Sequence, residues 1–382
     1  MTSIYLSSMK ICHLTSVHSS SDTRIFYKEC ISLAQAGNNV LLIAPGISRT
    51  ERGVNVIGIG MQPKSRMARM LLTTKRIYKK SLEQDADIYH LHDPELLPYA
   101  LKLKRKSKCV IFDSHENILE YMESKSYIPK PARKIVSSLF KRYATRILRK
   151  IDGIISVTPS FCNDFKAINP NTALITNYPF SPDTSDNSET IKKQRQLCFT
   201  GGISEQWCID LILKVIDDIP ETNIVLCGSF DNDEYERKLK DMPAWSKCDY
   251  LGILPFNKVK ATQQSSSIGL CILKYSQNTN FKEGTLGNTK LFEYMSSGTA
   301  VVCTDFNIWS EIIDRYHCGI VVSPNDPDAI SNAINYLLSH PEKCIEMGKN
   351  GKNAVTLEFN WETQADSLVK FYKQITDNAA LK

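Results

Sequence analysis

The sequence lacks any C-x-x-C pair, although it contains twelve cysteines. Several cysteines fall inside apolar runs such as KCVIF (108–112) and IVLCG (224–228), where a reduced cysteine behaves as a small hydrophobic side chain. This distribution argues against a disulfide framework, and it offers no metal-ligand cluster at a recognisable spacing. The sequence also lacks a secretory signal and any uncharged run long enough to span a bilayer, so we expect a cytoplasmic protein.

The chain's length and charge distribution both indicate two parts. At 382 residues it exceeds the length at which a single core keeps growing, so two domains are expected. Residues 1–180 hold 27 Lys and Arg against 14 Asp and Glu, whereas residues 181–382 hold 20 against 27. Such an imbalance suggests halves with different partners. The first eight residues are expected to be irregular, with Met9 as an alternative start.

Short β-rich runs alternate with helical patterns along both halves, which is typical of parallel sheets with crossover helices. The predicted strands are KICHLTS (10–16), NVLLIAP (39–45), DADIYHLH (85–92), KCVIFDSH (108–115), GIISVTP (153–159), LCFT (197–200), NIVLCG (223–228), SSIGLCIL (266–273), TAVVCT (299–304) and CGIVVSP (318–324). The pattern predicts an α/β protein of two doubly wound Rossmann-like domains, 1–180 and 181–360, with a linker at 177–196. A final helix, 361–382, is expected to pack back toward the first domain. Ligands of such sheets gather beyond the carboxyl ends of the strands and in clefts between domains.

The stretch GTLGNTKLFEYMSSGTAVV (284–302) carries the most chemistry. Its glycines permit a tight loop, and Asn288 and Thr289 are expected to cap a helix that begins near Lys290. The positive end of that helix favours an anion such as a diphosphate. Glu293, on the second turn, can accept two hydroxyl groups, as a ribose presents them. The pattern alone equally fits a plain loop–helix–strand unit with a surface glutamate.

The segment NTKLFEYMSSGTAVV (288–302) resembles the donor-site signature of the retaining family 4 glycosyltransferases of the GT-B fold, of the bacterial surface-polysaccharide type. Residues 13–45 resemble the opening of that group. HLHDPELLPYALKLK, IFDSHE, DGIISVTP and FTGGISEQW follow in the expected order, so the likeness covers residues 10–375. It implies two domains facing across a cleft, transfer from a nucleotide-diphosphate sugar with retention, and no required metal. The donor's own phosphate would deprotonate the acceptor.

The resemblance also implies a donor site in the second domain. Glu293 matches the second glutamate of a pair and would bind the ribose, whereas the first glutamate of the pair is replaced by Thr285. Backbone N–H groups of 284–288 are expected to hold the sugar hydroxyls instead. Relatives often place an Arg and a Lys after the glycine turn, but none follows it here, so Lys290 or Lys282 is expected at the diphosphate. The expected donor contacts are Gly201, Gly202, Gly228, Lys282, Thr285, Leu286, Gly287, Asn288, Lys290 and Glu293.

Polar residues at strand ends of the first half are the acceptor-side candidates. The resemblance implies that His115 faces the donor sugar and the reacting centre, which makes it a catalytic candidate beside Glu293. A purely structural histidine fits the pattern equally well. His92 and Asp93 are expected to meet the acceptor, with Asp93 as a helix cap the alternative. Asp22 and Arg24 in the first loop present the same choice between capping and acceptor contact.

Residues 130–150 hold eight Lys and Arg and no acid. Apolar residues at 135, 136, 139, 140, 143, 144, 147 and 148 form a stripe at helical spacing. A core-packed helix with a solvated charged face explains this pattern. A surface helix without acids also suits an anionic membrane, since each nearby cation contributes about 1 kcal/mol. A nucleic-acid partner is not expected, because no zinc spacing or RNP-type motif is present.

We therefore expect a cytoplasmic enzyme at the inner face of the membrane. It would use a UDP- or GDP-sugar and a lipid-linked or polysaccharide acceptor in capsule, O-antigen or exopolysaccharide synthesis. Two alternatives remain open: a nucleotide-sugar 2-epimerase of similar build, and a non-catalytic scaffold that binds nucleotide sugars.

Overall fold

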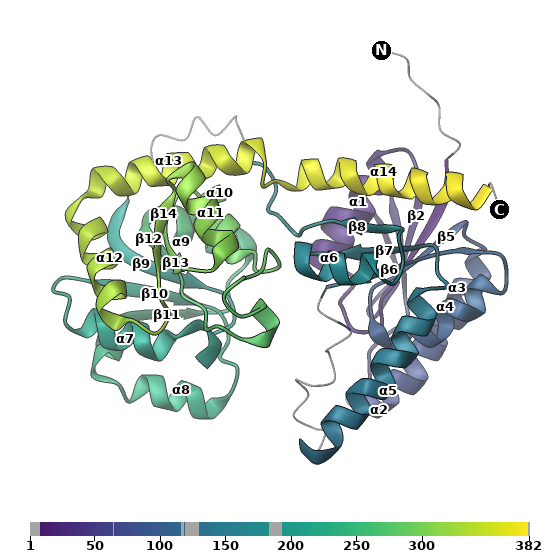
Figure 1. Ribbon diagram of the computed structural model, residues 1–382, viewed down its shortest axis with the longest axis horizontal. Helices are drawn as coiled ribbons and strands as arrows, with labels where there is room; N and C mark the ends of the chain where they lie inside the picture. Colours follow the sequence, from purple (N-terminus) through teal and green to yellow (C-terminus); the bar gives the residue numbers. More distant parts are fainter. Residues whose placement is uncertain (1–7, 64, 116–117, 119–129, 183–192, 381–382) are drawn as a thin grey trace, which may run out of the picture. The chain divides into compact units, whose positions relative to one another are not determined.

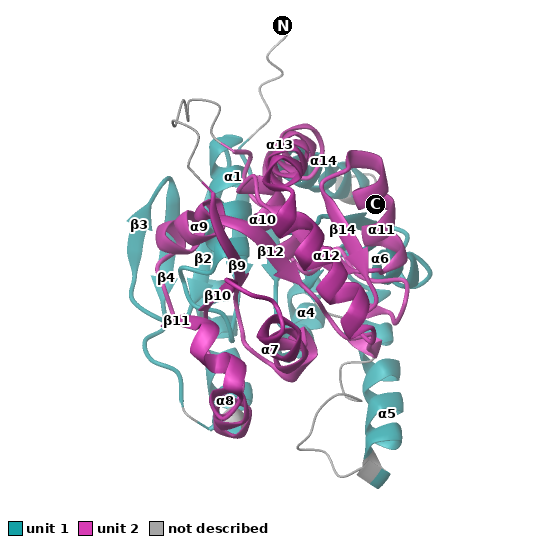
Figure 2. Ribbon diagram, turned by 90° about the vertical axis from the view of Figure 1, so that its left-hand side faces the viewer, with its two compact units in different colours: residues 1–177, 363–382 teal, residues 178–362 magenta. Residues whose placement is uncertain are grey.

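The computed structural model describes the chain except residues 1–7, 64, 116–117, 119–129, 183–192 and 381–382. It divides into two compact units (Figures 1 and 2): unit 1 comprises Met1–Asn177 with Thr363–Lys382, and unit 2 comprises Tyr178–Glu362. The middle of the linker that the sequence predicts, and the first seven residues, lie outside the described residues.

Unit 1 is built on an eight-stranded sheet of order β3-β4-β2-β1-β5-β6-β7-β8, in which only the β3–β4 pair is antiparallel. The strands are β1 Lys10–Leu14, β2 Asn39–Ala44, β3 Arg49–Glu51, β4 Val54–Gly58, β5 Ile88–Leu91, β6 Cys109–Ser114, β7 Gly153–Ser156 and β8 Thr172–Leu174. The helices are η1 Thr23–Cys30, α1 Ile31–Gln35, α2 Arg66–Ala68, η2 Arg69–Thr73, α3 Thr74–Gln84, η3 Pro94–Leu96, α4 Leu97–Lys104, α5 Lys130–Leu148, α6 Pro159–Lys166 and most of α14 Trp361–Ala380. Strands β1, β2, β5, β6 and β7 are buried almost throughout, which explains their continuous apolar runs.

The first helical segment of unit 1 begins with an uncommon geometry. Its first eight residues, Thr23–Cys30, form a π-helix, and the following turn, Ile31–Gln35, is α-helical. The segment ends before Gly37, whose φ of +89° lies in the left-handed region that glycine favours at the ends of helices. A π-helical stretch shifts the side chains relative to an α-helix, and such stretches are frequent at functional sites.

The predicted basic helix corresponds to α5. Ile147 and Leu148 in its last turn are buried as expected, but Ile135 and Leu139 are 66% and 60% exposed. Of the two alternatives for this helix, core packing thus holds only for the end of the apolar stripe. The reason is length: α5 has 19 residues and packs on α4, which has eight.

Unit 2 contains a six-stranded, wholly parallel sheet of order β11-β10-β9-β12-β13-β14. The strands are β9 Gln194–Thr200, β10 Asn223–Cys227, β11 Cys248–Gly252, β12 Ser266–Cys271, β13 Ala300–Thr304 and β14 Gly319–Val322. The helices are η4 Glu205–Trp207, α7 Ile209–Asp217, α8 Asp233–Lys240, η5 Pro243–Lys247, α9 Phe256–Ser265, η6 Gln277–Thr279, α10 Lys290–Ser296, α11 Asn307–Tyr316, α12 Pro327–Ser339 and α13 Pro341–Leu357. Both units are thus Rossmann-like α/β folds, as the alternation of strands and helices predicts.

The cysteines of the chain are core residues, as the sequence predicts. All twelve cysteines are free, and all except Cys248 are buried, so they act as core side chains. Within the described ranges, no helix is both long and apolar enough to cross a membrane.

Candidate functional site

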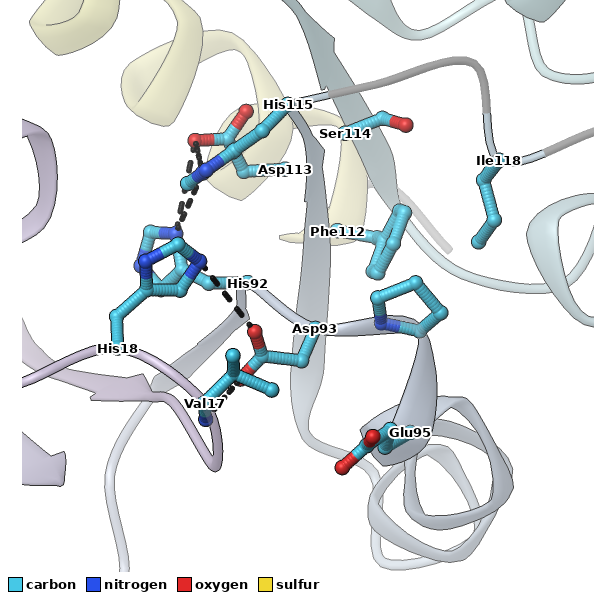
Figure 3. Close-up of a pocket in the computed structure, with 11 residues that line it drawn as sticks. Val17, His18, His92, Asp93, Glu95, Phe112, Asp113, Ser114, His115 and Ile118 are labelled. Carbon is cyan, nitrogen blue, oxygen red and sulfur yellow. Dashed lines mark hydrogen bonds and ion pairs between the residues drawn. The ribbon is translucent and has the colours of Figure 1, made fainter. Parts of the chain in front are cut away.

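Unit 1 contains a cavity of about 210 Å³ where the strands β1, β5 and β6 end. Figure 3 shows the polar side chains around it, among them His18, His92, Asp93, Asp113 and His115. Because β1, β5 and β6 are parallel neighbours, their carboxyl ends meet at one edge of the sheet. The sequence predicted His92, Asp93 and His115 here, but it did not identify His18 or Asp113.

Asp113 organises the histidines of this cavity. Its Oδ2 lies 3.0 Å from Nε2 of His115 and 3.5 Å from Nδ1 of His92. Burial acts to raise the pKa of Asp113, but Arg24 and His115 outweigh it and hold that pKa well below its ordinary value. An ionised carboxylate therefore orients both imidazoles. Asp113 was not identified from the sequence because it directly follows the apolar run KCVIF and lies near the end of a strand that is buried throughout.

Arg24 does not lie where the sequence analysis placed it. The side chain is buried, and its Nε and Nη2 donate hydrogen bonds to Asp113 at 3.0 and 3.1 Å. Its Nη1 donates to the carbonyl of Ile175 at 3.1 Å. The predicted acceptor contact for Arg24 is therefore wrong. Its guanidinium instead stabilises the Asp113 carboxylate through two hydrogen bonds.

Asp93 and Asp22 both hold the loop that follows β1. Asp93 is 2% exposed and accepts hydrogen bonds from the Thr15 hydroxyl at 2.9 Å and the Val17 N–H at 3.2 Å. It makes no side-chain cap to the following helix, so the capping alternative is wrong for Asp93. Asp22 does cap its helix: it accepts from the N–H groups of Arg24 and Ile25, each at 2.9 Å.

His18 connects these two aspartates. Its Nδ1 lies 3.3 Å from Asp22. Its Nε2 lies 3.6 Å from Asp93, a contact that Figure 3 shows. The hydrogen bond to Asp22 is the main cause that raises the pKa of His18 above its ordinary value, and burial opposes it. The imidazole at this edge of the cavity therefore favours the charged form.

In unit 2, the turn after β9 is shaped by close backbone contact. Gly201 and Gly228 have φ values of +125° and +143°. A Cβ on Gly228 would lie 2.0 Å from the carbonyl oxygen of Gly201, so only glycine fits there. A Cβ on Gly202, by contrast, would have no atom within 4 Å and would project into open space.

No Lys or Arg directly follows the glycine turn in the sequence, but the structure brings the Lys290 ammonium next to that turn. Its Nζ would lie 2.5 Å from a Cβ on Gly201, and it stands 4.1 Å from the centroid of the Trp207 ring. Burial lowers the pKa of Lys290. Among the described residues no carboxylate forms an ion pair with it, whereas Lys282 pairs with Asp305 and bonds the Tyr275 hydroxyl at 3.1 Å. Because its ammonium is already paired with Asp305, Lys282 does not fit the expected role of a diphosphate ligand.

The helix α10 begins at Lys290 as predicted, but it is not capped as predicted. Thr289 has helical φ and ψ and makes no cap; its hydroxyl donates instead to Oε1 of Glu293 at 2.7 Å. The carboxylate of Glu293 is therefore held in place one turn into the helix. Asn288 and Glu293 are both partly exposed.

Hydrogen bonds of Thr285 hold the loop before α10 in place. Thr285 is buried, its carbonyl accepts from the Trp309 indole at 2.8 Å, and its hydroxyl accepts from the Gly287 N–H at 3.0 Å. That N–H is consequently unavailable to a sugar, in contrast to the expectation for the backbone of 284–288. Leu286 is also buried, and its side chain anchors the loop in the core.

A buried cluster beneath the unit 1 cavity was missed altogether. His13, Glu29 and His90 join His92 with all four side chains buried. Burial is the main cause that lowers the pKa of His13, His90 and His92, so these imidazoles favour the neutral form. No sequence spacing reveals the cluster, because its members come from three separate elements.

Family models and known proteins give matching results for the two halves. Residues 23–177 match the model of Glycosyltransferase Family 4, and residues 181–354 match the model of the glycosyl transferases group 1. An uncharacterized glycosyltransferase of Methanocaldococcus jannaschii is 23% identical over 194 residues, which is 50% of this chain and 47% of that protein. The chain thus matches about half the length of this curated relative.

Solved structures share the whole architecture at low sequence identity. A sucrose-phosphate synthase from Thermosynechococcus elongatus superposes with a TM-score of 0.72 at 15% identity, covering 97% of this chain and all of that one. Anabaena HepE in complex with UDP-glucose gives 0.70 at 14% identity, covering 96% of this chain and all of that one. These likenesses show the GT-B fold. The two family matches and the shared fold together identify the chain as a glycosyltransferase of the GT-B fold, related to family 4.

Proposed function

We propose that this protein transfers a sugar from a nucleotide-diphosphate donor bound in unit 2 to an acceptor hydroxyl held at the unit 1 cavity. One observation carries the proposal: α10 places Lys290 over the glycine turn and Glu293 one turn further on. A partly buried ammonium without a carboxylate partner among the described residues suits an anionic ligand. The HepE structure, which shares the fold, was solved with UDP-glucose and makes a UDP-sugar the first donor to test.

On the donor side, each residue has a distinct task. The Lys290 ammonium would stabilise the charge that develops on the departing diphosphate, in a site partly shielded from water. The Glu293 carboxylate would accept hydrogen bonds from two ribose hydroxyls, and the Thr289 hydroxyl holds it ready to do so. The acceptor hydroxyl would lose its proton to the phosphate of the departing diphosphate, so transfer with retention would need neither an enzyme base nor a metal.

On the acceptor side, the cavity offers donors and acceptors of hydrogen bonds. The Asp113 carboxylate orients His115, so the remaining ring nitrogen of His115 has a defined direction. The His92 side chain is buried, and its Nε2 lies 2.9 Å from Nδ1 of His13, so His92 supports the cavity without contacting the acceptor. We propose that His115 faces the reacting centre, and that Asp93 acts by fixing the loop at 15–18. The sucrose-phosphate synthase has the same fold, so the fold alone does not select the acceptor.

The surface of α5 favours a lipid-linked or membrane-borne glycan as that acceptor. Ile135, Leu139 and Tyr143 are exposed at 66%, 60% and 44%, one turn apart from each other. The open surface beside them is lined by Lys141, Arg142, Arg146, Arg149 and Lys150, together with Ser138 and Thr145. Exposed apolar residues among cations without acids are what an anionic membrane binds. We propose peripheral docking at the cytoplasmic face through α5.

The decisive experiment is a panel of UDP- and GDP-sugars, tested first for saturable binding and then for transfer. We expect Glu293→Ala to lose donor turnover, whereas Glu283→Ala, an exposed change in the preceding loop, retains it. Product NMR should show the anomeric configuration of the donor. Wild-type turnover by Glu293→Ala would refute the donor site. An isomeric nucleotide sugar formed from donor alone would indicate an epimerase, and binding without transfer or hydrolysis would indicate a scaffold.

A further inference from the structure

Three histidines and a glutamate come together in the core of unit 1 for reasons of topology. His13 on β1 is the register partner of His90 on β5, so both side chains point to the same face of the sheet. His92 follows two residues later and shares that face. The π-helical segment Thr23–Cys30 contributes Glu29 to the cluster.

The ligand atoms of this cluster have the spacing of a coordination shell. Oε2 of Glu29 lies 3.9 Å from Nδ1 of His13, from Nδ1 of His90 and from Nε2 of His92. Nδ1 of His13 and Nε2 of His92 are 2.9 Å apart. Ligands about 2.0–2.2 Å from a tetrahedral Zn²⁺ are separated from one another by roughly 3.3–3.5 Å. The observed distances bracket this value, so shifts of less than an ångström would complete the shell.

Glu29 has one ion-pair partner, Arg24, and no hydrogen bond in the described structure. The residue is fully buried, and neither of its oxygens has a hydrogen bond in the described structure. Nε of Arg24 lies 3.0 Å from Oε1, but the donors of that guanidinium are directed at Asp113 and Ile175. Arg24 compensates the Glu29 carboxylate only in part, because Asp113 shares the same guanidinium, and a cation among the four groups would complete the compensation.

We propose that His13, Glu29, His90 and His92 bind one divalent transition-metal ion, with Zn²⁺ as the best match to three imidazoles and a carboxylate. This ligand set and its near-tetrahedral spacing suit zinc, whereas Mg²⁺ and Ca²⁺ prefer shells of oxygen. All four side chains are buried, which makes the site closed and structural. It takes no part in sugar transfer.

Residues around the cluster supply the outer hydrogen bonds of such a site. The Tyr372 hydroxyl on α14 lies 3.5 Å from Nε2 of His13 and can accept its N–H once Nδ1 binds metal. The same hydroxyl now lies 2.6 Å from Nδ1 of His90, and the metal bond replaces that hydrogen bond. With Nε2 of His92 on the metal, its Nδ1–H faces Asp113 at 3.5 Å, so the ion would fix a histidine that lines the cavity.

The test uses the full chain, purified without a histidine tag, with metal content measured by inductively coupled plasma mass spectrometry. We expect about one zinc per chain in the wild type. Chelator-treated protein titrated with Co²⁺ should develop the strong visible absorption of a four-coordinate site. Glu29→Gln keeps the side-chain shape and removes the charge, so it should lose stoichiometric metal.

His340→Gln is the matched control, because His340 is exposed and lies in unit 2; it should keep the metal of the wild type. Circular dichroism of Glu29→Gln establishes that loss of metal is not loss of fold. The proposal is overturned if the wild type holds no more zinc than the buffer alone and Co²⁺ gives no visible band. It is also overturned if Glu29→Gln keeps about one zinc per chain, because the carboxylate would then not be a ligand. Neither result bears on the donor site.

Discussion

The ammonium of Lys290 stands 4.1 Å from the centroid of the Trp207 ring, above a turn that begins with Gly201. The lysine belongs to α10 and the tryptophan to η4, which are separated by more than eighty residues in the sequence. Contact with an aromatic face stabilises a cation without neutralising its charge. The positive charge therefore remains available to a ligand at the glycine turn.

Lys290→Met should weaken the donor site selectively. The substitution keeps the length of the side chain and its contact with Trp207 but removes the charge. A hydrogen bond to a charged phosphate contributes about 1.5–3 kcal/mol, so kcat/KM for the nucleotide sugar should fall roughly 10- to 100-fold. Isothermal titration of UDP or GDP should show a matching loss of affinity.

Lys282→Met is the control for that experiment. Lys282 already pairs with Asp305 at the surface of the same unit. Its substitution should therefore leave donor affinity within about twofold of the wild type, because surface ion pairs contribute little. Equal losses for the two variants would contradict the assignment of the diphosphate to Lys290.

Gly201→Ala and Gly202→Ala form a second matched pair. A Cβ at 201 would lie 2.5 Å from the Lys290 Nζ and would require a φ of +125°, so the lysine must move. A Cβ at 202 meets nothing within 4 Å. We expect a raised KM for the donor and a lower melting temperature for Gly201→Ala only. A normal KM for Gly201→Ala would mean that the position of Lys290 is unimportant.

The fold followed from periodicity, whereas the details of the site did not. Buried parallel strands and short crossover helices leave a signal in consecutive residues, so every strand predicted from an apolar run is present. The cap of α10 was predicted from residue type alone. Thr289 adopts helical geometry and bonds Glu293, a choice that depends on the carboxylate one turn away.

The sites that were missed depend on contacts between distant segments. Glu29 and His90 lie far apart in the sequence and meet only in the folded unit 1. Asp113 directly follows an apolar run, which marks the segment as a buried strand and not as a site. Arg24 was assigned to the acceptor because it lies in the first loop, but the structure turns it inward. Its position shortly after an aspartate cap could not reveal this, because solvent-exposed arginines occupy the first turns of helices just as readily.

Arg24→Met should destabilise unit 1 strongly. The guanidinium lies 3.0 Å from both Asp113 and Glu29, and all three side chains are almost fully buried. Removing one partner of such a network typically costs about 3–5 kcal/mol, because the remaining charges stay buried. Urea unfolding measures the loss. Arg315→Met, which breaks the exposed pair with Glu358, should change stability very little, and similar losses for both would contradict the buried role of Arg24.

Ile135→Ser combined with Leu139→Ser should reduce binding to anionic vesicles without affecting fold. Both side chains are exposed, so their removal leaves no cavity in the core. Cosedimentation with phosphatidylglycerol vesicles should fall severalfold, since each lost apolar group weakens insertion into the interface. Ile253→Ser, an equally exposed change in unit 2, should bind as the wild type does. Equal binding to neutral phosphatidylcholine vesicles would contradict an electrostatic contribution.

Lys193→Met should alter the pH dependence of stability. Burial lowers the pKa of Lys193 from its ordinary value of 10.5 to about 8 in the folded protein. Below about pH 8 the lysine is charged in both the folded and the unfolded chain, so the full cost of burying that charge is present, at most about 3 kcal/mol. Between about pH 8 and 10.5 the folded chain binds fewer protons than the unfolded chain, so the wild type gains stability relative to the variant as pH rises.

Urea unfolding should therefore find Lys193→Met the more stable protein near pH 7, with the difference shrinking toward pH 10. A difference that stays constant over this range would show that Lys193 carries no buried charge, and a variant less stable near pH 7 would show that its hydrogen bond to Thr299 at 3.0 Å outweighs burial.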